Sequence, residues 1–202
     1  MIEFIENNVL DKNNQSIVVS YNRTVSIPFG NYPYPEDIHN LIILIKQNVD
    51  EKSSYACNVK ARRTDWDFFS KHPIAQKFIA FCINKHQVSN PDIFQYFFDR
   101  KAIESCWGNE IRKGDYVQSH IHNVVHAILY LTEGEPLILP ELNIKIHPKP
   151  GDYYFFPPVI YHYVNKSTSD KNRYNLIMNI EENPSNFFDK SKQIMEKYGK
   201  DS

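Results

Sequence analysis

The sequence lacks a charge bias that would dictate its partners. Its 202 residues hold 23 Lys and Arg against 24 Asp and Glu, so the formal net charge is −1, and no five like charges stand in a row. Without a basic patch or an acidic tail, the chain has no whole-molecule field that attracts a polyelectrolyte. We therefore expect a small molecule or a peptide as the substrate, and nucleic acid is not favoured.

Long apolar runs and paired cysteines are also missing. The longest stretch without Asp, Glu, Lys or Arg, Tyr116 to Thr132, contains three His and does not suit a bilayer-spanning helix. The segment from Met1 to Glu6 is acidic and lacks the basic-then-apolar order of a secretory signal. The 3 Cys are odd in number and widely spaced, which suits buried thiols in a reducing compartment. We expect a cytoplasmic protein that makes no use of a membrane.

Glycine is scarce, with 6 residues, whereas 13 Tyr and 13 Phe bring the aromatic share to 14%. Such large, β-favouring side chains argue against an all-helical bundle. No repeat, low-complexity run or Gly/Ser linker interrupts the chain. One domain over residues 1–202 is therefore expected, and its 42% hydrophobic residues suffice for a core.

The apolar pattern divides the chain into helices and strands. Helical spacing marks 36–49 after a proline, 73–85 and 184–199. The apolar and aromatic runs that predict strands are Ser16–Ile27, Phe94–Trp107, Val124–Leu131, Leu137–Leu139, Asn143–His147, Tyr153–Phe156 and Arg173–Ile180. This order favours an α+β chain in which a sandwich or small barrel, about residues 94–182, has helices from about 36–86 and 184–199 on its outside.

Histidines provide the strongest chemical signal. His120 and His122 are separated by one residue, which on an extended strand puts both imidazoles on the same face. His162 follows a turn, an apolar strand and a second turn, so another strand delivers a third imidazole. Three converging imidazoles suit Fe(II), Zn(II) or a similar ion and leave coordination positions open for a ligand or water.

Arg173 begins a strand of strict alternation, and it shares one face with Asn175. A guanidinium that points into a barrel must meet an anion, because burying it unpaired costs several kcal/mol. The simplest candidate is the distal carboxylate of a small dicarboxylate bound at the metal. The alternative is a structural salt bridge with Asp152 or Glu181.

The other histidines carry weaker signals. His126 would share the ligand face only if the strand ran unbroken from His120, and a turn at Asn123 would spoil that parity. The spacing from His122 to His126 also occurs in helical zinc proteases, but no Glu follows His122 and the surroundings favour a strand. The histidines read as ordinary surface or core residues are His39, His72, His86 and His147.

An ordered series of short motifs resembles a known family. The elements, in chain order, are Asn58-Val59-Lys60-Ala61, Thr64-Asp65-Trp66, Trp107-Gly108, Lys113-Gly114-Asp115-Tyr116, His120-x-His122, Gly151-x5-Pro157, His162, Arg173 and Asn179-Ile180. Together they resemble the 2-oxoglutarate/Fe(II)-dependent oxygenases related to the prolyl 4-hydroxylases, of the kind encoded by bacteria and tailed bacteriophages. The match covers roughly residues 58–181.

This resemblance implies a double-stranded β-helix, also called a jelly roll. His120 and His122 would follow its second strand, His162 would lie on the seventh and Arg173 on the eighth. The implied reaction couples oxidative decarboxylation of 2-oxoglutarate by O2 to hydroxylation of a second substrate, with Fe(II) held by the three His. Arg173 would hold the 2-oxoglutarate. The candidates to hydrogen-bond it are Asn175, Tyr130 and Tyr116.

The sequence departs from the wider superfamily at His122, where Asp or Glu is usual. A neutral imidazole leaves bound Fe(II) with its double charge, which the 2-oxoglutarate dianion can neutralise by chelation. The alternative is that Asp115 or Glu133 completes the metal shell and His122 faces solvent. Halogenation is disfavoured, because related halogenases carry a small residue at this position.

Two other functions fit the same residues. Gly114-x5-His120-x-His122 and Gly151-x5-Pro157 with His162 also match the cupin pattern, so a cupin-type metalloenzyme that does not use 2-oxoglutarate is one alternative. A non-enzymatic jelly-roll module with structural zinc is the other. Neither of these functions requires an arginine at the position of Arg173.

Three further features are less specific. The basic cluster Lys60–Arg63 could contact an acidic substrate or form a solvated turn, and the loop Gly30–Pro35 could cover a barrel mouth or merely lead into a helix. Trp107 and Asn109 could face the substrate. Nothing in the sequence names that substrate.

Overall fold

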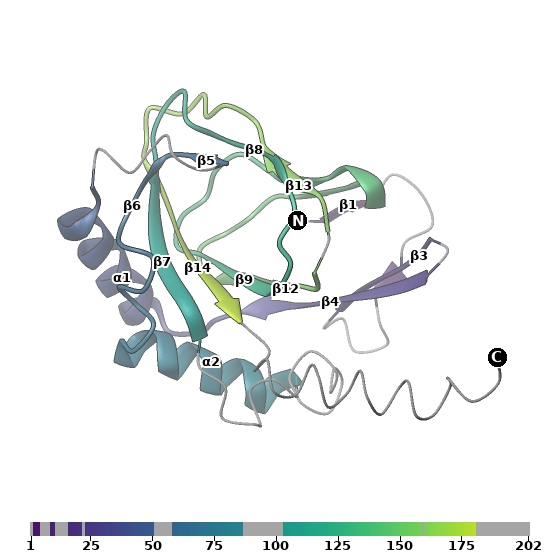
Figure 1. The fold of residues 1–202 in the computed structure, drawn as a ribbon, viewed down its shortest axis with the longest axis horizontal. Helices are drawn as coiled ribbons and strands as arrows, with labels where there is room; N and C mark the ends of the chain where they lie inside the picture. The colour runs from purple at the N-terminus through teal and green to yellow at the C-terminus, as the bar shows by residue number, and fades with distance from the viewer. Residues whose placement is uncertain are drawn as a thin grey trace, which may run out of the picture.

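The described residues form two antiparallel β-sheets, with two helices packed on the larger one (Figure 1). The computed structural model of the chain describes residues 2–4, 9–10, 16–21, 23–50, 58–86, 103–158 and 160–180. The smaller sheet contains, in spatial order, β1 (Ile2–Phe4), β11 (Ile144–Ile146), β10 (Leu137–Leu139), β13 (His162–Val164), β8 (Tyr116–His120) and β5 (Val59–Lys60). The larger contains β2 (Val9–Leu10), β3 (Ser16–Tyr21), β4 (Arg23–Asn31), β12 (Asp152–Phe156), β9 (Val125–Tyr130), β14 (Arg173–Ile180), β7 (Ile103–Ile111) and β6 (Arg62–Arg63).

The strands from β7 to β14 form a double-stranded β-helix. In the larger sheet they lie in the order β12, β9, β14, β7, and in the smaller sheet in the order β11, β10, β13, β8. The last strand therefore pairs with the first of the eight, and the seventh pairs with the second. This confirms the α+β jelly roll with flanking helices, and it gives β8, β13 and β14 the second, seventh and eighth places that the resemblance implies.

The larger sheet has an apolar core on each face. On the outer face it packs against the helices, and on the inner face it packs against the smaller sheet. The alternation in β14 follows this division, because Leu176 and Met178 lie in the helix-side core and Ile177 lies in the core between the sheets. The cavity-facing side of the same strand carries Arg173 and Asn175.

Both described helices agree with the sequence pattern. Helix α1 (Pro35–Asn48) begins at a proline and buries Ile38, Leu41 and Ile45 against the sheet. Helix α2 (Pro73–His86) also begins at a proline, and it buries Phe78 on its sheet-facing side. A short 3-10 turn, η2 (Pro140–Leu142), connects β10 to β11. The predicted helix at 184–199 lies outside the described residues.

The predicted strand Ser16–Ile27 is wrong as a single element. The chain forms two strands there, β3 and β4, which pair antiparallel with Tyr21 opposite Arg23. The Val, Ile and Tyr content that favours strands also favours a hairpin, because both arms share it. Strand β7 ends at Ile111, beyond the predicted end at Trp107, and part of 94–107 lies outside the described residues.

The segment Gly30–Pro35 connects β4 to α1. Tyr32 is buried beside Phe78 and Phe81 of α2, and its hydroxyl donates a hydrogen bond to Asp37 at 2.6 Å. The interpretation as a simple connection is therefore the correct one, since this tyrosine packs on the helix side of the sheet.

No helix among the described residues is long and apolar enough to span a membrane.

Helix α1 packs directly on the backbone of β7 at Gly108. A Cβ at that position would lie 2.2 Å from Ile45 Cγ1. We predict that Gly108→Ala lowers the free energy of unfolding by about 1–3 kcal/mol, because the helix must shift to admit the methyl group. Urea unfolding measures the change. In an Ile45→Ala background the same substitution should cost much less, and an equal cost in both backgrounds would contradict the contact.

Candidate metal centre

A cavity lies between the two sheets. One wall comes from the inner face of the larger sheet and the other from the smaller sheet, including its edge strand β5. Its lining residues are Val59, Trp107, Asn109, Ile111, Val117, His120, His122, His126, Ile128, Tyr130, Leu137, His162, Val164, Arg173, Asn175 and Ile177. The lining combines apolar side chains with a few histidine, arginine and asparagine side chains, which is typical of small-molecule sites.

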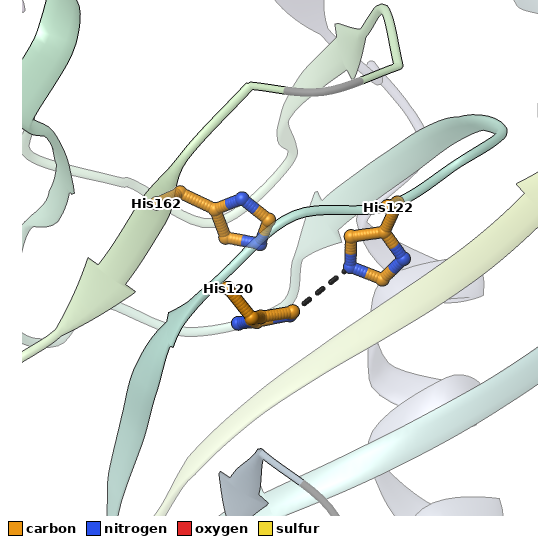
Figure 2. A group of neighbouring side chains, drawn as sticks. All are labelled: His120, His122 and His162. Carbon is orange, nitrogen blue, oxygen red and sulfur yellow. Dashed lines mark hydrogen bonds between the residues drawn. The ribbon is translucent and has the colours of Figure 1, made fainter.

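His120, His122 and His162 converge at this cavity (Figure 2). Each offers one ring nitrogen, and these three atoms lie within 4.8 Å of one another. His120 ends β8 and His162 begins β13 directly opposite it. The Nε2 atoms of His120 and His122 are 3.1 Å apart. Three nitrogens at this spacing can bind one divalent transition-metal ion.

His122 lies just beyond the end of β8. The strand ends at His120, and His122 is in the irregular connection that follows, before the bends at Asn123 and Val124. The predicted turn at Asn123 is therefore present, and both imidazoles reach the same site. Asp115, the proposed substitute ligand, instead accepts a hydrogen bond from the backbone N–H of Arg112 at 2.7 Å, and Glu133 is exposed. Neither belongs to the group of neighbouring ligand atoms found among the described residues.

Backbone carbonyls orient two of the three rings. The Nδ1 atom of His120 lies 2.8 Å from the carbonyl oxygen of Gln118, and that of His162 lies 3.0 Å from the carbonyl oxygen of Ile160. A carbonyl only accepts hydrogen bonds, so each Nδ1 carries the proton and each Nε2 keeps its lone pair. Outer hydrogen bonds of this kind are typical of metal-binding histidines.

Burial keeps the three imidazoles neutral. It lowers the pKa of His122 to about 3 and the pKa of His162 to about 4, and in both cases neighbouring imidazoles lower it further. Burial also lowers the pKa of His120. Neutral rings have the lone pairs that a metal ion needs, so the site is ready for an ion at neutral pH.

His126 lines the same cavity although a turn separates it from His120. It is 1% exposed and lies on β9, opposite Asn179 of β14 and Phe156 of β12. Its ring centroid is 4.1 Å from that of His122. It is not part of the three-histidine group. The turn at Asn123 interrupts the side-chain alternation that begins at His120. His126 still reaches the cavity, because it lies on β9, a new strand in the facing sheet.

Arg173, the first residue of β14, is buried and lines the cavity. Its Nη1 donates a hydrogen bond to the carbonyl oxygen of Glu135 at 2.9 Å, and its guanidinium carbon lies 5.6 Å from the centroid of the Tyr130 ring. Its Nε has no hydrogen-bond partner within the described part of the chain. Gly134 passes so close that a Cβ there would lie 2.2 Å from Arg173 Cδ.

Neither carboxylate proposed as a salt-bridge partner of Arg173 pairs with it among the described residues, although the carboxylate of Glu135 attracts it electrostatically. Asp152, one of the proposed partners, accepts hydrogen bonds from Asn31 and from the backbone of Lys149. Glu181, the other, lies outside the described residues. A buried guanidinium with an unused donor is what an anion-binding site requires. No sequence signal pointed to Gly134 or to Glu135, because the first acts by being small and the second through its backbone.

Two of the three hydrogen-bonding candidates line the cavity. Asn175 Oδ1 accepts a hydrogen bond from Asn109 Nδ2 at 2.9 Å. The Tyr130 hydroxyl is buried and without a partner among the residues described, and burial raises its pKa to about 12. Tyr116 is different: it is not a lining residue, and the ammonium group of Lys166 lies 5.7 Å from its ring centroid. A register shift in β8 aims Val117 at the cavity instead.

The basic cluster closes one side of the barrel. Strand β5 pairs with β8 of the smaller sheet and β6 pairs with β7 of the larger, so the residues between them cross from one sheet to the other. Arg62 pairs with the buried Glu110, and the Arg63 guanidinium stacks 3.6 Å from the ring centroid of Trp66. Both arginines thus have structural contacts, and Val59 is the member of this segment that lines the cavity.

Comparison with known proteins places this arrangement in a recognised fold. No family model matches the chain, and no curated protein matches its sequence. A viral collagen prolyl hydroxylase from Paramecium bursaria Chlorella virus 1, solved as a 2OG complex, superposes with a TM-score of 0.58 at 15% identity, covering 75% of this chain and 93% of that one. A prolyl-4-hydroxylase from Pseudomonas putida gives 0.57 at 14% identity, covering 78% and 93%.

The chain has the fold of the prolyl 4-hydroxylases and related 2-oxoglutarate oxygenases. HygX from Streptomyces hygroscopicus, solved with nickel and 2-oxoglutarate bound, gives a TM-score of 0.50 at 8% identity and covers 75% of this chain and 81% of that one. At these identities the likeness concerns the fold. The expected fold relationship is therefore confirmed, whereas the chemistry must be argued from the residues of the cavity.

The neutral imidazoles make stability depend on pH. Below about pH 6.5 the unfolded chain binds protons at these histidines that the folded protein excludes, so the metal-free protein should lose stability as the pH falls from 7 toward 4. Each such imidazole contributes a slope of up to about 1.4 kcal/mol per pH unit. Urea unfolding at several pH values measures it. The His122→Asn variant should show a shallower slope near pH 5, and an unchanged slope would contradict the burial of a neutral ring.

Proposed function

We propose that the protein is a 2-oxoglutarate/Fe(II)-dependent dioxygenase that hydroxylates a small molecule or a peptide. One observation carries the proposal: a single cavity holds three neutral imidazoles at one end and a buried arginine with an unused donor at the other. His126, beside the imidazoles, and Tyr130, beside Arg173, are four residues apart on β9, about 13 Å along the strand. Since side chains extend into this gap from both ends, a short diacid suits it.

The residues present fit the proposed groups. His120, His122 and His162 would hold Fe(II) and leave positions open, and their neutrality leaves a double positive charge that a 2-oxoglutarate dianion neutralises. When bound, Fe(II) and 2-oxoglutarate would supply the chemistry that activates O2, the oxidant, so that oxidative decarboxylation of the cosubstrate is coupled to hydroxylation of a second substrate.

The chain's own groups bind and orient. Arg173 would donate from Nε and from its remaining Nη protons to the distal carboxylate, and the Tyr130 hydroxyl would donate to the same group. Asn109 fixes the amide of Asn175, because Asn175 Oδ1 accepts its hydrogen bond and the amide protons then turn toward the ligand. The apolar lining, which includes Ile128 and Ile177, keeps water from the reacting groups.

The two alternatives explain less of the cavity. A cupin-type metalloenzyme that does not use 2-oxoglutarate would need the three imidazoles but not the buried Arg173. A structural zinc site would need a fourth ligand, and among the described residues the group of converging donors contains three. The buried arginine therefore favours the 2-oxoglutarate interpretation. The substrate to be hydroxylated is unidentified, and the near-neutral net charge makes nucleic acid the less favoured class.

Metal binding tests the first part of the proposal. Under anaerobic conditions the protein should bind one Fe(II), and adding 2-oxoglutarate should produce the visible charge-transfer band of its chelate. His120→Ala and His162→Ala should abolish Fe(II) binding in calorimetric titrations, because each removes one of three ligands. His122→Asp should retain binding, since a carboxylate can replace the imidazole, whereas His122→Ala should weaken it.

Two results would count against this site. Tight Fe(II) binding that survives in both His120→Ala and His162→Ala would exclude these residues as ligands. Equal affinity in His122→Asp and His122→Ala would remove His122 from the set. His72→Ala serves as the matched control, because His72 lies outside the cavity at the start of α2 and packs on Phe69.

Cosubstrate binding tests the role of Arg173. Arg173→Ala should keep Fe(II) binding but weaken binding of 2-oxoglutarate by about 2–4 kcal/mol, because a charge-assisted contact to the distal carboxylate is lost. Anaerobic titration of the charge-transfer band gives the affinity. Arg112→Ala is the control. Arg112 directly follows β7, the strand that pairs with β14, but it does not line the cavity. Unchanged affinity for 2-oxoglutarate in Arg173→Ala would make this arginine structural.

A further inference from the structure

The three imidazoles are not held in the same way. His120 and His162 each donate an Nδ1 hydrogen bond to a backbone carbonyl two residues earlier in the chain. Among the described residues His122 has no such bond, and the hydrogen-bond contact of its ring is with His120. It also lies in the irregular connection between β8 and β9 and not on a strand. The ligand at the position where the superfamily usually has a carboxylate therefore needs another means of orientation.

A stack of flat rings fills this role. The ring of His126 lies against that of His122 with centroids 4.1 Å apart and planes 25° from parallel. The His126 ring also stacks on that of Phe156, with centroids 5.0 Å apart and planes 23° from parallel, and on that of His162, with centroids 4.9 Å apart and planes 24° from parallel. Phe156 and His126 face each other across β12 and β9, so the larger sheet anchors the stack. His122 belongs to the opposite side of the cavity and rests on it.

His126 makes these contacts through its ring faces. It is 1% exposed, and neither ring nitrogen has a hydrogen-bond partner among the described residues. It also lies outside the group of three histidines whose nitrogens converge. A buried polar ring without hydrogen bonds is rare and calls for an explanation. Its flatness and its place between Phe156 and His122 supply one.

We propose that His126 is a positioning residue that holds the His122 ring in its metal-binding orientation by stacking. The inference rests on the proposed function, since it assumes that His122 binds the ion. The hydrogen-bond partners of a carboxylate set its direction. An imidazole that has no such partner and lies outside a strand can rotate about its Cα–Cβ and Cβ–Cγ bonds. The flat face of His126 restricts this rotation, so less freedom is lost when the ion binds.

Three substitutions at His126 separate ring stacking from other roles. His126→Ala should weaken Fe(II) binding about tenfold, as the loss of outer support for a metal ligand typically does. His126→Leu, which fills most of the space without a flat face, should weaken it similarly. His126→Phe should restore most of the affinity. Anaerobic calorimetry gives the affinities, and the electron paramagnetic resonance spectrum of the Cu(II)-loaded protein should change in the Ala and Leu variants but keep its nitrogen ligands.

A double-mutant cycle tests whether His126 acts through His122. In a His122→Ala background, the further change His126→Ala should have little effect on Fe(II) affinity. Leu129→Ala is the matched control, because Leu129 is a buried residue of β9 that lies in the helix-side core and does not line the cavity, so its loss should leave the affinity near that of the wild type. Thermal unfolding of the metal-free variants identifies any that fail to fold, and the Leu and Phe variants retain the packing volume.

The outcomes discriminate among the roles. Unchanged affinity in His126→Ala and His126→Leu would overturn the inference while leaving the proposed function intact. Equal loss in His126→Phe and His126→Ala would assign the role to a ring nitrogen, either as a ligand or as a hydrogen-bonding group, and would also overturn it. An additive effect in the double variant would do the same. Absence of Fe(II) binding by the wild type would overturn the proposed function and this inference together.

Discussion

The pairing of β14 between β7 and β9 is the interaction on which the rest of the site depends. All eight residues of β14 have register partners on β7, and six of them also face β9. The last described strand thereby closes the barrel between strands that precede it by many residues. Because side chains alternate along a strand, this register decides that Arg173 and Asn175 enter the cavity while Tyr174 and Leu176 enter the helix-side core. A slip of one residue would exchange the two sets.

The cavity combines two electrostatic demands that a single ligand can meet. At one end, burial keeps the imidazoles neutral, so a bound divalent ion would retain its charge. At the other end, Arg173 remains a buried cation that donates a hydrogen bond to the carbonyl of Glu135 and keeps an unused donor at Nε among the described residues. A small dianion lying between them would satisfy both. Since Gly134 leaves room for the arginine side chain, the backbone itself is shaped around the guanidinium.

Particular residues show where sequence reasoning succeeded and where it failed. The helices α1 and α2 and the strands β10 and β14 follow from local periodicity, and they occur almost as expected. The hairpin of β3 and β4 was read as one strand, because a pattern of β-favouring residues does not mark a reversal. Tyr116 was expected at the cosubstrate, but the register shift between β8 and β13 turns Val117 inward in its place. The alternation counted from His120 argued against His126 at the cavity, but the direction of its side chain is set by the alternation within β9.

Sequence alone determined which chemistry was available: two histidines separated by one residue, a third before a later strand, and an arginine that begins an alternating strand. Those inferences needed only residue type and local spacing. The tertiary structure decided how the groups meet, including the stack of His126 on Phe156 of the neighbouring strand and its contact with His122, which follows a strand of the other sheet. The contact between His126 and His122 joins segments of two different sheets. Their geometry depends on register and on strand closure, which arise from long-range backbone pairing and leave no mark in any short stretch of sequence.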